Sequence, residues 1–282
     1  MGSVRAKTVI DALTSKDHFA AQALRSISNS VSGGGDIGEV LLAWNRFDLA
    51  TDKGQTKGDA WFDTWSKLAE DVEARADNFN CPHSKATSHL RATDYFRTSE
   101  FFIRGLDNLA DPRRQLALNG TGRNFQQYLK HSGKEFDFFR TELCAGYIIK
   151  PEQGVSTPHP LVILPSGYDA ICEEQWFAAG MAAHTRGYVV VLVDGPGQGH
   201  VLRDLKNPLY LSPELYDMAM VQLVDMLGSK DFIDESKIAL FGRSFAGCLS
   251  IRAAASLKGK LAALLLDPPQ PNQKATVLGK KL

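Results

Sequence analysis

The chain has 282 residues, and its composition is close to that of an average globular protein, with 44% hydrophobic and 23% charged residues. Its 24 glycines and 12 prolines are too few for collagen or for a low-complexity disordered chain. The 32 basic residues match the 32 acidic residues, so the formal net charge is zero and excludes a general attraction to nucleic acid or anionic lipid.

Membrane spans, leader sequences and cysteine frameworks are not expected either. No apolar run reaches the roughly 18 residues that a spanning helix needs, and the N-terminus leads into no apolar signal-peptide core. The four cysteines have neither CxxC nor Cys/His spacing. We therefore expect a cytoplasmic protein without metal or cofactor, and without a nucleic-acid or membrane partner. The oligomeric state is left open, with a homodimer as one alternative.

Residues 1–140 show helical periodicity and no convincing strand. The segment Asp59–Asp77 carries one apolar stripe at helical spacing, made of Trp61, Trp65, Leu68 and Val72. A broad aromatic face marks Ser84–Leu106, and Asn124–His131 is a shorter helix. We interpret the stripes as core packing, with a ligand pocket as the alternative, and we expect 1–140 to form a helical N-terminal domain.

Residues 141–282 alternate short apolar strands with helices. The predicted strands are Glu142–Ile149, Leu161–Leu164, Tyr188–Val193, Ile238–Phe241 and Leu261–Leu266. The predicted helices are Gln175–Thr185, Pro213–Leu227 and Ala246–Leu257. Continuously apolar strands that alternate with helices are typical of a parallel sheet covered on both faces and joined by right-handed crossovers. We therefore predict an α/β core in which chemistry is carried at the carboxyl ends of the strands.

The strongest chemical motif lies between the strand Ile238–Phe241 and the next helix. Gly242-Arg243-Ser244-Phe245-Ala246 has the Gly-x-Ser-x-small spacing of a nucleophile elbow. A serine on so sharp a strand–turn–helix bend needs small residues two positions to either side, which Gly242 and Ala246 provide. The helix that follows directs its positive end at Ser244. The alternative is a serine that only caps the helix.

Two other loops leave the same predicted sheet edge. After the strand Leu161–Leu164, an amide at Gly167 or Tyr168 is a candidate oxyanion donor, and the amide of Phe245 is another. The glycine-rich loop Asp194–His200 is not interpreted as a dinucleotide site. Pro196 removes an amide that a phosphate would need, and no helix is expected to begin directly after the loop. No acidic residue follows at a strand end about 20 positions further on.

These motifs resemble one branch of the α/β-hydrolase superfamily, which includes the 2,6-dihydroxypseudooxynicotine hydrolase and fungal hydrolases that shorten polyketide pigment precursors. The matching segments are Leu90–Arg97, Tyr168-Asp169, Arg186–Tyr188, Asp194–Gly199, Gly242–Ser244 and Leu266–Pro268. The resemblance covers about residues 59–270. It implies a helical cap over the serine site, a Ser-His-acid triad, and cleavage of an ester or carbon–carbon bond beside a ketone. The implied substrate is a hydrophobic, cyclic or polyketide-like molecule of secondary metabolism.

The chain departs from that branch after Ser244. In this fold the acid and the histidine of the triad follow the serine, but all seven histidines precede Ser244. The one later acid, Asp267, is either a relocated triad acid or a cap at a strand end. His200 lies on a loop after a strand expected to neighbour the serine strand, and it is the remaining candidate base. The pattern indicates a core whose C-terminal strands are missing.

Three hypotheses follow from these residues. The first is a serine hydrolase with Ser244 as nucleophile. The second is a truncated, catalytically impaired relative that binds a small molecule or assists another enzyme. The third is a product of a mis-set gene end, because Lys274–Leu282 lacks the pattern of a next strand. In each case the helices of residues 59–133 are expected to cover the carboxyl edge of the sheet.

Overall fold

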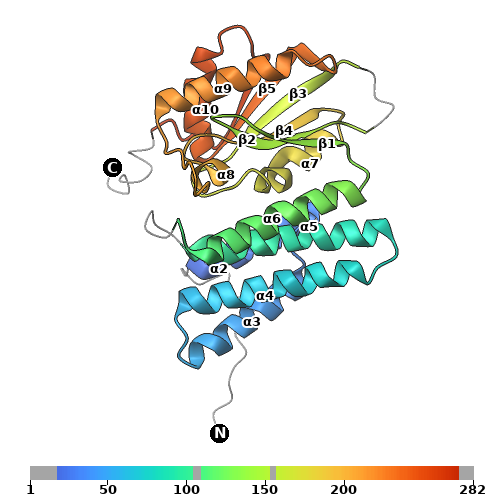
Figure 1. The fold of residues 1–282 in the computed structure, drawn as a ribbon, viewed down its shortest axis with the longest axis vertical. Coiled ribbons are helices and arrows are strands. Elements are labelled where there is room, and N and C mark those ends of the chain that lie inside the picture. The colour runs from blue at the N-terminus through green and yellow to red at the C-terminus, as the bar shows by residue number, and fades with distance from the viewer. Residues whose placement is uncertain (1–17, 104–108, 153–156, 273–282) are drawn as a thin grey trace. The chain divides into compact units, whose positions relative to one another are not determined.

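Two compact units make up the chain, Met1–Ser132 and Gly133–Leu282. The computed structural model describes residues 18–103, 109–152 and 157–272 (Figure 1). Leu106 and the tail Lys274–Leu282, both used in the expectations above, lie outside these residues. Among the described helices, none combines the length and the apolar character that crossing a bilayer requires.

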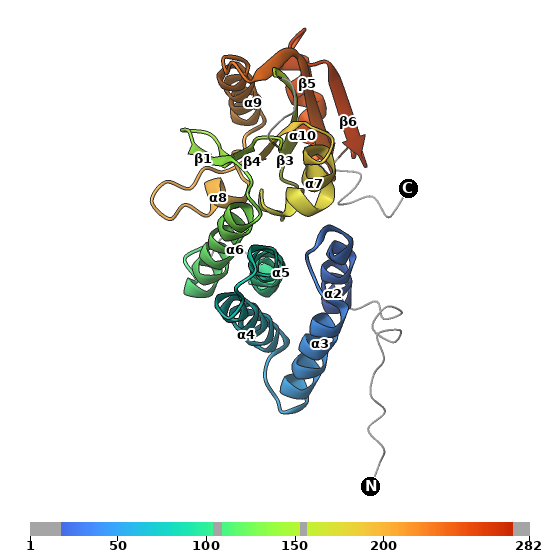
Figure 2. The same ribbon diagram turned by 90° about the vertical axis from the view of Figure 1, so that its right-hand side faces the viewer.

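In its described residues the first unit is built of helices, which Figure 2 shows side by side. They are α2 (His18–Ser28), η1 (Asn29–Ser32), α3 (Ile37–Asp52), α4 (Lys57–Asp77), α5 (Pro82–Ser99), η2 (Glu100–Phe102) and α6 (Pro112–His131). The side chains of Asp36, Thr56 and Asp111 cap α3, α4 and α6 by accepting hydrogen bonds from first-turn amides. The helix predicted at Asn124–His131 thus begins at Pro112, a residue type well suited to a first helical position.

The predicted apolar stripes form the core of this unit. The side chains of the α4 stripe are all buried: Trp61, Trp65, Leu68 and Val72. From α5 and η2, Tyr95, Phe96 and Phe101 are also buried, and the Phe102 ring meets Trp61 edge-on with centroids 5.2 Å apart. These faces therefore pack against one another, as core side chains do. That the unit covers the carboxyl edge of the sheet stays a prediction.

In its described residues the second unit contains a mainly parallel sheet of six strands, as the fold class predicted. The strands are β1 (Phe136–Arg140), β2 (Ala145–Ile149), β3 (His159–Pro165), β4 (Val189–Asp194), β5 (Ile233–Arg243) and β6 (Ala263–Asp267), in the order β1-β2-β4-β3-β5-β6. β4, β3, β5 and β6 are parallel, whereas β2 is antiparallel to both of its neighbours, so the expected parallel crossover does not apply to it. β1 was not predicted because its half-exposed sequence lacks the apolar run of the inner strands.

Helices cover both faces of this sheet (Figure 1). On one face, α9 (Pro213–Gly228) and α10 (Phe245–Ser256) pack against alternate strand residues such as Leu161 and Ile163. The predicted helix Gln175–Thr185 consists of a π-helical turn, η4 (Trp176–Gly180), and α7 (Met181–His184). Gly180 of η4 approaches the Leu192 side chain of β4, on the other face. The inner strands are continuously apolar because both of their faces are buried.

The last strand of the sheet, β6, is exposed. Leu264 and Leu265 keep 39% and 46% of their surfaces accessible, unlike any residue of β4. β6 pairs with β5 on one side and forms the edge of the sheet on the other. An apolar, unpaired sheet edge favours association with other strands.

A matched pair of leucines tests the core of the helical unit. Leu68→Ala removes a buried side chain from the α4 stripe, and we expect it to destabilise the protein by about 2–5 kcal/mol. Leu49→Ala, at an exposed position of α3, should change the stability by less than about 0.5 kcal/mol. Urea unfolding followed by tryptophan fluorescence measures both, since Trp44, Trp61 and Trp65 all belong to this unit. Equal losses for the two variants would contradict the assigned core.

Candidate active site

Ser244 lies at the junction of β5 and α10 with a strained backbone. Its φ of 58° and ψ of −126° fall in a region that residues other than glycine rarely adopt. A Cβ at Gly242 would lie 2.6 Å from both the Ala246 carbonyl oxygen and the Ser250 hydroxyl, so only glycine fits there. Ser244 makes no side-chain capping hydrogen bond to α10. The bend is therefore a nucleophile elbow in its geometry, and its catalytic role stays a prediction.

The end of β6 supports this bend from the side. The Ser244 amide donates a 3.1 Å hydrogen bond to the backbone carbonyl of Asp267. A Cβ at Gly247, on the first turn of α10, would lie 2.7 Å from the Pro268 carbonyl oxygen, so the two segments touch closely. The contact made by Asp267 comes from its main chain, and the residue is exposed. Whether its carboxylate acts in a triad stays an open hypothesis.

The loop after β3 lies beside Ser244. A Cβ at Gly167 would be 3.9 Å from the Ser244 Cβ and 3.7 Å from the Arg243 carbonyl oxygen. The Tyr168 ring meets the Phe245 ring edge-on, with centroids 5.8 Å apart. The three predicted oxyanion residues, Gly167, Tyr168 and Phe245, are thus neighbours around the serine, at the N-terminus of the twelve-residue helix α10. Developing negative charge is favoured at such a helix end.

A partly buried ion pair joins the segment that follows β4 to the segment that follows β3. His200, on α8 (Gly199–Leu202), has its Nε2 2.7 Å from the Glu173 Oε1, and the Tyr147 hydroxyl donates to the same oxygen at 2.9 Å. Burial is the largest influence at Glu173 and raises the pKa of its carboxyl, but the charge and hydrogen bond of His200, with the hydrogen bonds of Tyr147 and the backbone, together lower that pKa. Burial is also the largest influence at His200, but the charge and hydrogen bond of Glu173, with the charge of Asp194, together raise the pKa of the imidazole. Both directions favour the charged pair.

This ion pair bears on the predicted base. The strand before the His200 loop was expected to neighbour the serine strand, which is wrong: β3 separates β4 from β5. The His200 Nε2 is occupied by Glu173, so the structure does not bring His200 and Ser244 together as a hydrogen-bonded pair. Sequence reasoning missed Glu173; the available signal is an acidic residue inside the buried segment Ala170–Phe177.

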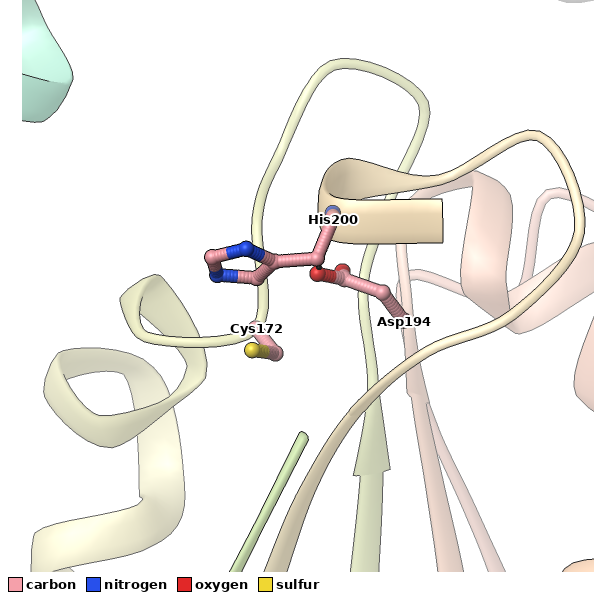
Figure 3. Close-up of side chains that lie close together, drawn as sticks. All are labelled: Cys172, Asp194 and His200. Atoms are coloured by element: carbon pink, nitrogen blue, oxygen red, sulfur yellow. Dashed lines mark hydrogen bonds between the residues drawn. The ribbon is translucent and has the colours of Figure 1, made fainter. Parts of the chain in front are cut away.

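His200 and two neighbouring side chains, Cys172 and Asp194, have the chemistry of metal ligands (Figure 3). One donor atom each of Cys172, Asp194 and His200 lies within 4.8 Å of the others, the group that could hold a metal ion among the residues described. A sulfur, a carboxylate and an imidazole form a set that Zn²⁺ accepts. These groups already have hydrogen-bond partners: the Cys172 thiol donates to Glu173 at 3.4 Å, and the Asp194 carboxylate accepts from the Ser166 hydroxyl and from the His200 backbone amide. A metal ion would have to displace these bonds, so the residues present do not fit one as they stand.

The glycine-rich loop also proves unsuited to phosphate. A short helix, α8, does begin at Gly199, contrary to expectation, but it has only four residues. The amides of Gly195 and Gly197 are already donated to Gln198 Oε1 and to the Leu209 carbonyl. The Asp194 carboxylate lies directly over Gly199, where a Cβ would come within 2.0 Å of its Oδ2. A buried carboxylate at this place would repel a phosphate.

The charged pair predicts a pH-dependent stability. The raised pKa of His200 gives a contribution that is complete below about pH 6.5, the ordinary histidine value, and is lost as pH rises through the higher folded-state value. The difference in Tm between the wild type and His200→Gln should therefore be largest near pH 6 and shrink toward pH 9. Differential scanning fluorimetry measures it, with His83→Gln, an exposed site on α5, as the control. A gap that widens with pH would contradict a charged pair.

Comparisons with known proteins agree with this fold. No family model matches the chain. The hydrolase acrC of Aspergillus aculeatus is 28% identical over 263 residues, which cover 85% of this chain and 59% of the relative. The 20-hydroxy-prefusarin hydrolase FUS2 of Gibberella moniliformis is 29% identical over 249 residues, covering 84% and 58%. The chain thus spans less than two thirds of the curated relatives it matches.

Solved structures show the same architecture. The 2,6-dihydroxy-pseudo-oxynicotine hydrolase superposes with a TM-score of 0.65 at 22% identity, over 83% of this chain and 62% of that one. AbyA5 gives a TM-score of 0.54 at 20% identity, over 73% and 54%. The sheet order and the serine elbow therefore define the α/β-hydrolase fold. In sequence and fold the chain is similar to these fungal hydrolases and to the 2,6-dihydroxy-pseudo-oxynicotine hydrolase.

Proposed function

We propose that the protein is a serine hydrolase in which Ser244 attacks a substrate carbonyl. The observation that carries this proposal is the backbone of Ser244, since a φ of 58° at a non-glycine residue is a cost that persists mainly at functional sites. The amide of Phe245, and one at Gly167 or Tyr168, would bind the oxyanion of the tetrahedral intermediate. The close approach of Gly167 to Ser244 supports this arrangement.

The proposed substrate is a hydrophobic, cyclic or polyketide-like small molecule with an ester, or with a carbon–carbon bond beside a ketone. Two similar proteins bear the names of hydrolases of small organic molecules, 20-hydroxy-prefusarin and 2,6-dihydroxy-pseudo-oxynicotine. In either reaction Ser244 Oγ bonds to the carbonyl carbon and loses its proton to a base. The leaving alkoxide or carbanion takes up a proton, and water then releases the acyl group from the serine.

A second candidate function is that of a catalytically impaired binding protein. A serine hydroxyl is a poor nucleophile unless a base takes its proton. In this chain no histidine follows Ser244, and the His200 Nε2 is bound to Glu173. Loss of a triad base lowers the catalytic rate by several orders of magnitude, although the oxyanion hole and substrate binding retain part of the catalysis. The proposed hydrolase activity of these 282 residues is therefore weak.

The nucleophile is tested by covalent labelling. A fluorophosphonate probe should label Ser244 slowly, because the hydroxyl lies beside oxyanion donors but lacks an assigned base. Intact-mass spectrometry follows the reaction, and peptide mapping locates the adduct. Labelling that continues unchanged in Ser244→Ala would show that the nucleophile lies elsewhere.

Turnover separates the two candidate functions. We expect p-nitrophenyl acetate to be hydrolysed by the 282-residue chain at well below about 1 per second, an ordinary enzyme rate. Absorbance of p-nitrophenolate measures the turnover in the wild type, His200→Ala and Ser244→Ala. A rate of about 1 per second or more that persists in His200→Ala and is lost in Ser244→Ala would refute the claim that these residues lack a base for Ser244.

A further inference from the structure

The glycine-rich loop after β4 forms hydrogen bonds with Ser166 in the loop after β3, and Ser166 directly precedes Gly167. We infer that Asp194 and Gln198 are positioning residues that fix the Ser166–Gly167 peptide, and that the Gly167 amide is thereby directed at the oxyanion. The inference rests on the proposed function, because it assigns the second oxyanion donor of that same site.

All three hydrogen-bonding groups of Ser166 are held by the segment around β4. Its amide donates to the Val193 carbonyl at 3.0 Å, as the parallel register of the two strands continues past β3. Its hydroxyl donates to the Asp194 Oδ1, and its carbonyl accepts from the Gln198 Nε2. Ser166 and Asp194 are fully buried, and Gln198 is 3% exposed. Buried bonds of this kind are strong constraints, because breaking one leaves a polar group without water.

The bond from Gln198 sets the direction of the Gly167 amide. A trans peptide is planar, and its N–H points opposite to its C=O. The Ser166 carbonyl is turned toward Gln198 on the β4 side of β3, so the Gly167 N–H is turned toward the β5 side. Ser244 follows β5, and Gly167 contacts it there. Donation to the carbonyl also polarises the peptide and strengthens its N–H as a donor.

Gln198 is itself held in place, so it can fix its partner. Its Oε1 accepts a 2.9 Å hydrogen bond from the Gly195 amide, which leaves the Nε2 aimed at Ser166. Asp194 is held by the His200 amide at 2.9 Å and lies in the space that Gly199 leaves open. The glycines of Asp194–Gly199 thus let the backbone fold around Asp194 and Gln198, which is a role that needs no ligand.

The test compares variants that cut the two bonds with a control that cuts a similar bond elsewhere. Ser166→Ala removes the hydroxyl from Asp194, and Gln198→Met removes both amide bonds at nearly constant length. Ser26→Ala is the control, because Ser26 is a buried serine that donates to a buried aspartate, Asp94, in the helical unit. The rate of phosphonylation at saturating fluorophosphonate should fall about 10-fold in Ser166→Ala and in Gln198→Met. This is a part of the roughly 10²- to 10³-fold loss of rate that removal of a whole oxyanion donor causes. The concentration for half-maximal rate should change less than about 2-fold.

Hydrogen exchange provides a measurement that does not depend on reactivity. Exchange of a peptide spanning Ser166–Asp169 should speed up about 10-fold in Ser166→Ala and Gln198→Met, and should stay at the wild-type rate in Ser26→Ala. If the wild type is not labelled at Ser244, the proposed function fails, and hydrogen exchange alone decides whether Asp194 and Gln198 fix the Ser166–Gly167 peptide. If the wild type is labelled and both variants react and exchange as Ser26→Ala does, the positioning role of Asp194 and Gln198 is refuted and the proposed function stands. If Gln198→Met does not fold, Ser166→Ala decides in the same way.

Discussion

The backbone of Ser244 is held at φ 58° and ψ −126° between a strand and a helix, and such a conformation costs a non-glycine residue on the order of 1–3 kcal/mol. Three neighbouring segments hold it. Gly242 lets α10 approach β5, the Asp267 carbonyl accepts the Ser244 amide, and Gly247 packs against the main chain at Pro268. The elbow therefore depends on the close packing of β5, β6 and α10, and a substitution at any of these contacts acts on the serine.

The loop after β3 contacts Ser244 through Gly167, and the loop after β4 holds that first loop through Ser166. The side chains of Asp194 and Gln198 form hydrogen bonds with Ser166 and with amides of their own loop, which explains why a glycine-rich loop here does not offer free amides to a phosphate. In the same region His200 pairs with Glu173, and no hydrogen bond joins the His200 imidazole to Ser244 among the described residues. The structure thus brings the proposed oxyanion residues together beside Ser244 and leaves the proton acceptor of the proposed mechanism unassigned.

Local sequence predicted the elements that depend on neighbouring residues. The apolar strands, the Trp61–Val72 stripe and the glycine at position 242 each follow from spacing within one turn or strand, and the structure has them. What the sequence did not predict depends on the order of strands. The contact of Glu173 with His200 joins residues 27 positions apart, and β3 lies between β4 and β5, which no local pattern shows. The half-exposed edge strand β1 has no apolar run to reveal it.

The measurement that tests the central claim most directly is a crystal structure of the chain after reaction with a small organophosphonate. The account predicts a phosphorus–oxygen bond to Ser244 Oγ, with the phosphonyl oxygen about 2.7–3.1 Å from the amides of Phe245 and Gly167. It also predicts that the carbonyl of Ser166 still accepts from Gln198 in the adduct. An adduct on another side chain, or on Ser244 with the phosphonyl oxygen turned away from both amides, would contradict the account.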